Sequence, residues 1–431
     1  MSAAPTSRPP ADPPAPEDPA VLDDLDERDH RRLGRQLALF ASDELVGSGL
    51  PLWLPDGAVI RAQLERFVVE LEDRTGHQRV ATPVLGKREL YERSGHWDHF
   101  HDDMYPPLDL GDEQLVLRPS NCPHHVLIYR SEHRSFRDLP VRLAELGAMF
   151  RYERSGVVGG LSRVRAMTLN DAHVFATAEQ VGDEVGTILD LIEEAYGVLG
   201  IDGHRLRLSL SGSGRSYADG PWERAAQALR GVLAGRDLTW DEAADEAAFY
   251  GPKVDVQVRD ARGREETLST VQVDFHMPDA FALEYQDADG VRRRPVLIHR
   301  SLLSTMERLT AFLIERYAGA FPVWLAPVQL VVLPVGEAHL GAARALRDRA
   351  TGRGLRIEVA EPRASLGARV RRARQRRVPF MAVLGDREVA DGSVSLRRRD
   401  GVQPGSLPAG AVLDGLAELA RRRSLALDLA C

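Results

Sequence analysis

The chain has 431 residues, of which 43% are apolar and 28% charged, and its formal net charge is −8. This length predicts two or three domains, and no apolar run approaches the ~20 residues that a bilayer-spanning helix needs. The first residues lack the basic-then-apolar pattern of a secretory signal, and two cysteines exclude a disulfide framework, so we expect a cytoplasmic protein.

The C-terminal quarter differs in charge from the rest of the chain. From Val323 to the end the sequence holds 19 Arg, no Lys and 11 acidic residues, a net charge of +8, so the remaining residues carry −16. A basic unit on an acidic body predicts a polyanionic partner at that end. A solvated arginine-rich surface is the alternative interpretation.

The N-terminal end is rich in proline. Residues 1 to about 22 contain seven prolines and few large apolar side chains, so we predict a disordered tail over residues 1–27. A helix is predicted from Ala58 to Asp73, because its apolar residues recur on one stripe. The stripe consists of Ile60, Leu64, Phe67, Val68 and Leu71. An extended segment from Gln78 to Pro83 follows.

A short run over residues 118–125 holds Cys122 and, three positions later, His125. A Cys-x-x-His pair can be half of a structural zinc site, but the sequence has no second pair at finger spacing. A lone cysteine that fills space in the core is the alternative.

Two predicted strands, residues 143–153 and 163–175, are joined by a loop that holds three glycines. Successive side chains of a strand point to opposite faces, so Arg151 and Glu153 share one face of the first arm. On the second arm the same rule groups Arg163, Arg165, Asp171 and His173. Such a face is typical either of a solvated sheet or of a polar binding site, and the pattern alone leaves both open.

Antiparallel sheet is predicted to continue after this hairpin. Residues 177–180, Thr-Ala-Glu-Gln, form a capping-box signature that starts an apolar-striped helix. Strands are predicted at 254–258 and 270–275, joined by a short turn. A third strand, 295–300, leads into a helix over 302–317.

The pattern changes at Val328. From there strands and helices alternate, and the helix from Leu366 to Arg376 is basic. This alternation predicts a small α/β domain, with the proline-bounded segment 322–327 as its junction to the preceding unit.

Four features together resemble the class II aminoacyl-tRNA synthetases. The run 150–153, Phe-Arg-Tyr-Glu, with Arg163 after the loop is similar to motif 2 of that class, and residues 170–173, Asn-Asp-Ala-His, are similar to the threonyl-tRNA synthetase version. The helix and extended segment over 58–83 resemble motif 1. The strand and helix that carry Glu307-Arg308 resemble motif 3, and the C-terminal unit resembles the anticodon-binding domain of the class.

The resemblance implies an α+β fold. A class II catalytic domain, built on an antiparallel sheet with flanking helices, is expected over residues 28–323, and a small α/β anticodon-binding domain over 324–431. The implied activity is that of a ligase that activates threonine with ATP to threonyl-adenylate and transfers it to tRNA(Thr). Motif 1 forms the dimer interface in that class, so a homodimer is expected, with no membrane partner.

ATP, bound with Mg2+, is expected to meet positively charged side chains, because phosphoryl chemistry of this kind depends on positioned charge. By the resemblance, Arg151 holds the α-phosphate, Arg163 meets the outer phosphates and Arg308 contacts the triphosphate. Glu153 accepts a hydrogen bond from the adenine amine, and Gln272 lies near the nucleotide.

The threonyl family also binds a zinc ion, Zn2+, through one Cys and two His, which match Cys122, His173 and His299. Three protein ligands leave coordination positions open, as in zinc sites that work on a substrate. Threonine then meets the metal through its amino group and hydroxyl, and Asp171 accepts a hydrogen bond from that hydroxyl. Tyr250 and Lys253 match other residues that line the pocket.

Three more residues are assigned by the resemblance. His96 matches a histidine that takes part in aminoacyl transfer to tRNA, and packing beside Trp97 is its alternative role. Glu388 and Arg397 match residues that read anticodon bases, although a contact to phosphate is an alternative for Arg397.

The sequence also departs from the family pattern. Threonyl enzymes commonly carry editing and ubiquitin-like domains before the core, and only about 28 residues precede it here, so we expect no cis-editing of seryl-tRNA. The motif positions that differ are Ser120, Leu169, Asn170 and Ser304. Two alternative functions are a duplicate synthetase that confers inhibitor resistance and a catalytically idle, synthetase-like regulator that binds tRNA or protein.

Overall fold

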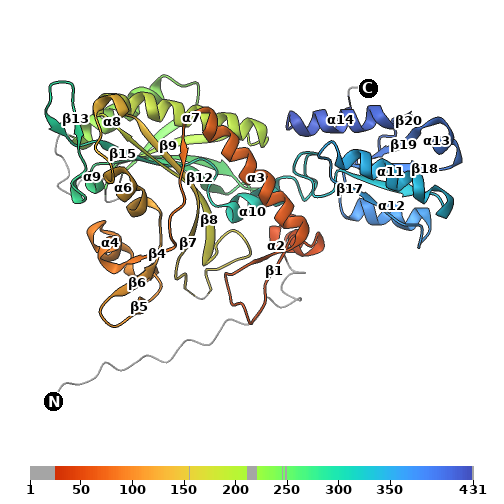
Figure 1. The fold of residues 1–431 in the computed structure, drawn as a ribbon, viewed down its shortest axis with the longest axis horizontal. Helices are drawn as coiled ribbons and strands as arrows, with labels where there is room; N and C mark the ends of the chain where they lie inside the picture. The colour runs from red at the N-terminus through yellow and green to blue at the C-terminus, as the bar shows by residue number, and fades with distance from the viewer. Residues whose placement is uncertain (1–24, 155, 211–220, 245, 248–249, 430–431) are drawn as a thin grey trace, which may run out of the picture.

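The computed structural model describes residues 25–429 except 155, 211–220, 245 and 248–249. Most of the predicted tail, residues 1–24, and the second cysteine, Cys431, lie outside the described residues. Figure 1 shows two units side by side, each with its own sheet and helices. None of the helices in the described part of the chain is both long and apolar enough to span a membrane.

The first unit is built on an eight-stranded sheet in which most neighbours are antiparallel. Only the outermost pairs at its two edges are parallel. In spatial order the strands are β10 Trp240–Ala244, β9 Arg205–Leu210, β11 Lys253–Arg259, β12 Glu265–Asp274, β15 Val296–Ser301, β8 Ala166–Ala176, β7 Val141–Phe150 and β3 Gln78–Arg79. The predicted hairpin and the predicted strands of the 254–300 region are therefore confirmed.

Four long helices bury their apolar stripes in the core beside this sheet: α3 Pro55–Arg74, α7 Val181–Val198, α8 Pro221–Ala234 and α10 Met306–Arg316. The short helix α2 His30–Gln36 packs on α10. The predicted stripe of α3 is at most 2% exposed throughout, which confirms that helix. Burying each such side chain contributes about 1.5–3 kcal/mol.

Smaller elements complete the first unit. One short pair is β1 Phe40–Ala41 with β2 Leu52–Trp53, another is β13 Tyr285–Gln286 with β14 Arg292–Arg293, and a three-stranded sheet contains β4 Leu85–Lys87, β6 Gln114–Leu117 and β5 Leu108–Asp109. The short helices are α4 Arg88–Arg93, α5 His96–Phe100, α6 Cys122–Arg130 and α9 His276–Ala280.

A buried ionic network ties α3 to the sheet. Glu72 accepts hydrogen bonds from Arg300 at 2.8 Å and from the Asn170 amide at 2.7 Å, and it also pairs with Arg79 at 2.8 Å. Glu72 and Arg300 are each 1% exposed. Removing one partner of such a pair leaves an uncompensated buried charge. Asn170, an atypical residue for the motif, has a structural role here because its amide donates to the buried Glu72.

The predicted arms of the central hairpin are too long at the loop end. β7 ends at Phe150 and β8 begins at Ala166. Beyond them the backbone bonds elsewhere; for example, the Tyr152 N–H donates to the Asp103 carbonyl at 2.7 Å. The expectation that charged side chains of this loop share strand faces is therefore wrong for Arg151, Glu153, Arg163 and Arg165.

The second unit is the predicted α/β fold. Its sheet has the order β17 Ile357–Val359, β16 Leu330–Pro334, β18 Phe380–Leu384, β19 Ser393–Arg398 and β20 Gly405–Pro408. The first three strands are parallel and the last two pairs are antiparallel. Its helices are α11 Leu340–Thr351, α12 Leu366–Gln375, α13 Asp386–Asp391 and α14 Ala409–Arg421.

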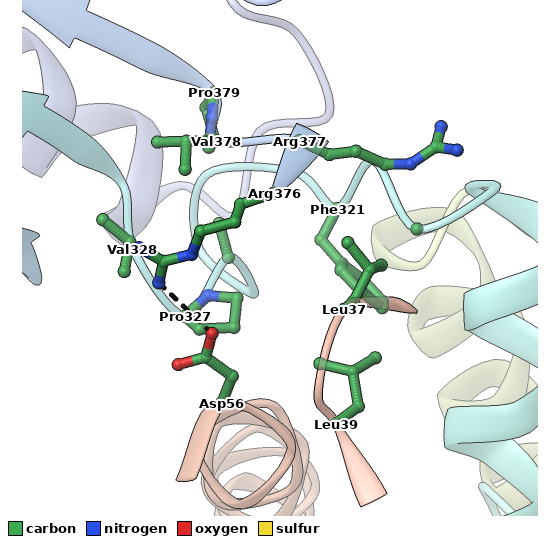
Figure 2. Close-up of a pocket in the computed structure, with 12 residues that line it drawn as sticks. Leu37, Leu39, Asp56, Phe321, Pro327, Val328, Arg376, Arg377, Val378 and Pro379 are labelled. Carbon is green, nitrogen blue, oxygen red and sulfur yellow. Dashed lines mark hydrogen bonds and ion pairs between the residues drawn. The ribbon is translucent and has the colours of Figure 1, made fainter. Parts of the chain in front are cut away.

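The two units meet at the start of α3. Figure 2 shows Asp56 of α3 facing Arg376 of the second unit, at 3.3 Å, beside Pro327 and Val328. The cavity that these residues line has a volume of only about 20 Å³. It is a packing gap at the junction, too small for a substrate and separate from the polar residues described next.

Candidate active site

One face of the large sheet carries a row of four polar side chains from neighbouring strands. Lys253 of β11 lies opposite Gln272 of β12. Gln272 in turn lies opposite His299 of β15, which lies opposite His173 of β8. Directly opposed residues point to the same face of a sheet. Four predicted site residues from separate parts of the sequence are thus neighbours.

Cys122 approaches this face from the first turn of α6. The preceding residue, Asn121, is fully buried, and a Cβ atom at Gly147 of β7 would lie 2.1 Å from its amide nitrogen. Glycine at 147 therefore lets the start of α6 lie directly on the sheet. One donor atom each of Cys122, His173 and His299 lie within 4.8 Å of one another.

Hydrogen bonds determine which imidazole nitrogens face this point. The Asp274 carboxylate accepts from Nε2 of His299 at 2.8 Å, so the proton of a neutral His299 is on Nε2. The Glu145 carboxylate accepts from Nε2 of His125 at 3.1 Å, and Nδ1 of His125 lies 2.9 Å from Nδ1 of His173. With neutral rings, His125 accepts there and His173 keeps its lone pair on Nε2.

The consequence is a contact between two acceptor nitrogens. Nε2 of His173 and Nδ1 of His299 lie 3.0 Å apart, and both present lone pairs to the gap. Only a cation, a proton or a metal ion, can bridge them. Burial by itself lowers the pKa of His299, but Cys122 and Asp274 raise it to about 10, so the surroundings favour positive charge in this gap.

The donor set fits zinc. Sulfur and imidazole nitrogen are common zinc ligands, with bonds of about 2.3 Å and about 2.0–2.1 Å, so donors of one tetrahedral ion lie roughly 3.3–3.8 Å apart. The two imidazole nitrogens are 3.0 Å apart, and the Cys122 sulfur lies within 4.8 Å of both. A carboxylate behind a ligating histidine, as Asp274 is behind His299, is a usual feature of zinc sites.

A second group of potential ligands, Asp29, His30 and Glu315, is used by the protein itself. Nδ1 of His30 lies 2.8 Å from Glu315, and its Nε2 accepts from the Leu161 N–H at 3.2 Å. Asp29 caps α2 and is paired with two arginines. These contacts account for the cluster without a metal.

Asp171 lies in β8, two residues before His173 and on the same face. It is 6% exposed, and its carboxylate makes no hydrogen bond or ion pair with any residue that the structure describes. Burial raises the pKa of this carboxyl to about 6. The carboxylate is therefore available to accept a hydrogen bond from a ligand at this face of the sheet.

Tyr250 lies beside the end of this row that holds Gln272 and Lys253. The Tyr250 hydroxyl donates to the Gln272 side-chain oxygen at 2.7 Å, and its ring centroid lies 5.2 Å from that of His299. Nζ of Lys253 pairs with Asp255 at 2.7 Å. The predicted pocket residues are therefore together, while Gln272 is engaged by Tyr250.

The predicted nucleotide residues lie at the loop end of the hairpin and on α10. Desolvation and the positive charge of the nearby Arg308 both lower the pKa of Arg151, although Arg151 keeps exposed surface. Arg308 donates to the Ser162 carbonyl at 3.3 Å. Arg163 and Glu153 form an ion pair with each other at 2.8 Å.

His96 lies between two hydroxyl groups. The Ser94 hydroxyl donates to the Tyr91 carbonyl at 3.2 Å and therefore accepts from Nδ1 of His96, at 2.8 Å. The Ser120 hydroxyl then donates to Nε2, also at 2.8 Å. Burial lowers the pKa of His96 to about 3, so the ring is neutral. The atypical Ser120 is thus in direct contact with the predicted transfer residue.

Ser304 is another departure from the motif, in which glycine is usual, and its backbone conformation gives the reason for that glycine. Its φ is +58°, in the left-handed region that glycine adopts without strain. Its carbonyl accepts the Asn170 N–H at 3.2 Å, which joins the start of α10 to β8.

The predicted anticodon residues lie in neighbouring elements of the second unit, α13 and β19. Glu388 is 8% exposed and accepts from the Gly385 N–H at 3.1 Å, so it caps its own helix. Arg397 lies opposite Met381 of the adjacent strand.

Three residues of the site were not found from the sequence: Asp274, His125 and Glu145. The sequence offered His125 only as the partner of Cys122 in a Cys-x-x-His pair. In the structure His125 forms a hydrogen bond with His173 and is not one of the clustered donors. The signal that could have found Asp274 is weak, because an aspartate at the end of a strand commonly caps the next helix. Asp274 does this too, by accepting the Met277 N–H at 3.0 Å.

Comparison with known proteins gives matches over most of the chain. Residues 105–317 match the family described as tRNA synthetase class II core domain (G, H, P, S and T), and residues 329–419 match the anticodon binding domain. The threonine–tRNA ligase of Oceanobacillus iheyensis is 50% identical over 383 residues, and that of Geobacillus sp. WCH70 is 51% identical over 382. Each alignment covers 88% of this chain but 59% of the relative.

A solved structure shows the same fold. The crystal structure of the RNA binding domain of threonyl-tRNA synthetase from Cryptosporidium parvum superposes with a TM-score of 0.85 at 34% identity. The match covers 91% of this chain and 98% of that one.

Proposed function

The chain belongs to the threonyl-tRNA synthetase family of class II aminoacyl-tRNA synthetases, and we propose that it activates threonine with ATP and transfers it to tRNA(Thr). The chain spans 59% of the length of the curated ligases it matches. The observation that carries the proposal is the Cys, His, His donor set beside the unpaired carboxylate of Asp171.

In this proposal Cys122, His173 and His299 hold a zinc ion. When bound, the ion supplies positive charge and open coordination positions for the amino and hydroxyl groups of threonine. Asp171 accepts a hydrogen bond from the hydroxyl. A site built around a substrate hydroxyl rejects an analogue that lacks it by roughly 10⁴–10⁵-fold, so valine is excluded.

At the nucleotide end, Arg151 and Arg308 stabilise negative charge on the phosphates of ATP, which carries Mg2+. Desolvation and the positive charge of Arg308 both lower the pKa of Arg151, so an anionic ligand would be favoured beside these two side chains. Glu153 is proposed to accept from the adenine amine and Arg163 to meet the outer phosphates. Their ion pair with each other must open for this to occur.

The proposal for tRNA concerns both units. His96 takes part in transfer to the terminal ribose, and Glu388 and Arg397 meet the anticodon. The first unit, residues 28–323, is the catalytic domain, and 324–431 is the anticodon-binding domain. A cytoplasmic homodimer is proposed by resemblance, with β3 at the edge of the large sheet as part of the interface.

Threonine-dependent ATP–pyrophosphate exchange, with zinc measured on the same sample, tests the proposal. We expect exchange with threonine, about one zinc per chain, and exchange with valine lower by roughly 10⁴-fold or more. A folded, zinc-loaded protein that gives no exchange would instead support the idle regulator.

Serine gives a further expected result. It differs from threonine by one methyl group, for which a pocket gains only about 10–200-fold. We propose that the 431-residue chain mischarges tRNA(Thr) with serine at a measurable rate and does not remove it. Purified seryl-tRNA(Thr) should therefore lose its serine no faster with the protein than in buffer, whereas rapid enzyme-dependent deacylation would refute this part.

A further inference from the structure

We propose that Glu145, acting through His125, is a positioning residue for the metal group, and that it links the orientation of His173 to the segment around Thr82. This inference rests on the metal site of the proposed function, but it concerns residues that do not themselves ligate. It predicts that metal affinity depends on side chains well outside the donor set.

The link consists of successive hydrogen bonds. Thr82 donates to Glu145 through its hydroxyl at 2.7 Å and its N–H at 3.2 Å, and Arg118 donates to the same carboxylate at 3.1 Å. Glu145 accepts from Nε2 of His125 at 3.1 Å, and Nδ1 of His125 meets Nδ1 of His173 at 2.9 Å.

The direction of these bonds is set by Glu145. Its carboxylate can only accept, and the Thr82, Arg118 and His125 groups around it all donate. In a neutral His125 the proton is therefore held on Nε2, and Nδ1 accepts from Nδ1–H of His173. That leaves Nε2 of His173 free to bind, facing His299. Because Arg118 is 1% exposed and His125 fully buried, the arrangement has little freedom to change.

The other end of the link lies at the edge of the sheet. Thr82 follows β3, and Arg118 also donates to the Thr82 hydroxyl, at 2.5 Å, and to the Ala148 carbonyl of β7, at 2.6 Å. A displacement of residues 78–83 would therefore disturb Glu145. The geometry points to a metal site whose affinity responds to the edge segment proposed for the dimer interface.

The test is metal affinity, measured without substrates. Apparent Zn2+ affinity is determined by competition with a chromophoric chelator at fixed pH for the full chain and for Glu145→Gln, His125→Gln and Thr82→Val. Loss of partners behind a ligand typically weakens binding 10–100-fold, and we expect this for the first two. Thr82→Val, which keeps the carboxylate, should weaken binding by about 2–10-fold.

His124→Gln is the matched control. His124 is the neighbouring residue of α6 and is also buried, but its Nδ1 has no hydrogen-bond partner among the described residues. Affinity in this variant should stay within about twofold of the parent. The absorption spectrum of the Co2+-loaded protein should change in Glu145→Gln, because the ligand geometry relaxes, and not in His124→Gln.

Two results would overturn the inference. One is a Glu145→Gln protein, shown to be folded by its thermal transition, that binds Zn2+ as tightly as the parent. The other is an equal loss in His124→Gln. If Glu145→Gln does not fold, the milder Thr82→Val decides by the same criterion. A parent that binds Zn2+ with this dependence but fails to exchange pyrophosphate would refute the proposed function alone.

Discussion

Replacing Cys122 by alanine should remove the bound metal and lower kcat/KM for threonine in pyrophosphate exchange by about 10³-fold or more. The thiol is one of the three clustered donors among the described residues, and its loss leaves two imidazoles whose nitrogens lie 3.0 Å apart. A site built around a substrate hydroxyl rejects an analogue without it by roughly 10⁴–10⁵-fold. Loss of the metal that binds this hydroxyl should remove most of that preference. Zinc content and exchange rate are measured on the same preparation.

The matched control is Cys431→Ala, which removes the only other thiol in the sequence. This variant should keep its zinc and its exchange rate. ATP binding, followed separately, should survive in Cys122→Ala because the nucleotide residues lie on other elements. A metal-free Cys122→Ala protein that exchanges within tenfold of the parent would show that threonine is recognised without the metal.

Local structure was predictable because the sequence is locally consistent. The stripe of α3 follows from spacing alone and was confirmed, and the predicted hairpin was confirmed between residues 143–150 and 166–175. Strand ends were less predictable. Whether residues beyond Phe150 stay paired depends on what else their backbone can bond, and here Tyr152 bonds to Asp103, a residue distant in the sequence.

The candidate site could be predicted only in part. Resemblance named Cys122, His173 and His299, but their closeness depends on the register between β8 and β15 and on the packing of α6 on Gly147. Neither is visible in the spacing of residues. The supporting Glu145 and Asp274 are separated from their histidines by 20 and 25 positions and resemble ordinary strand carboxylates in sequence.

The ion pair between two of the predicted nucleotide residues could not be predicted from the sequence either. Resemblance assigns Glu153 to adenine and Arg163 to phosphate, and opposite charges ten residues apart gave no sign that they pair with each other at 2.8 Å. Arg163 is 53% exposed and Glu153 12%, and an ion pair that reaches the surface in this way contributes about 1 kcal/mol. ATP can therefore separate the two side chains at small cost.

Replacing Arg151 by alanine should lower kcat of threonine-dependent exchange by about 10²–10³-fold. Negative charge grows on the α-phosphate as the carboxylate attacks, and removal of one positioned donor from such a transition state typically costs that much. Arg151→Lys should recover only part of the loss, because an ammonium group cannot reproduce the planar, two-pronged contact of a guanidinium. Steady-state exchange at saturating threonine, with ATP varied, separates kcat from KM.

Arg154→Ala is the matched control for this experiment. Arg154 is an exposed arginine of the same loop, and its side chain makes no ion pair with the residues that the structure describes. If general positive charge on the loop were what ATP requires, the two substitutions would have similar effects. If Arg151 acts by position, Arg154→Ala should stay within about twofold of the parent. A fall of less than fivefold in Arg151→Ala would show that another cation meets the α-phosphate.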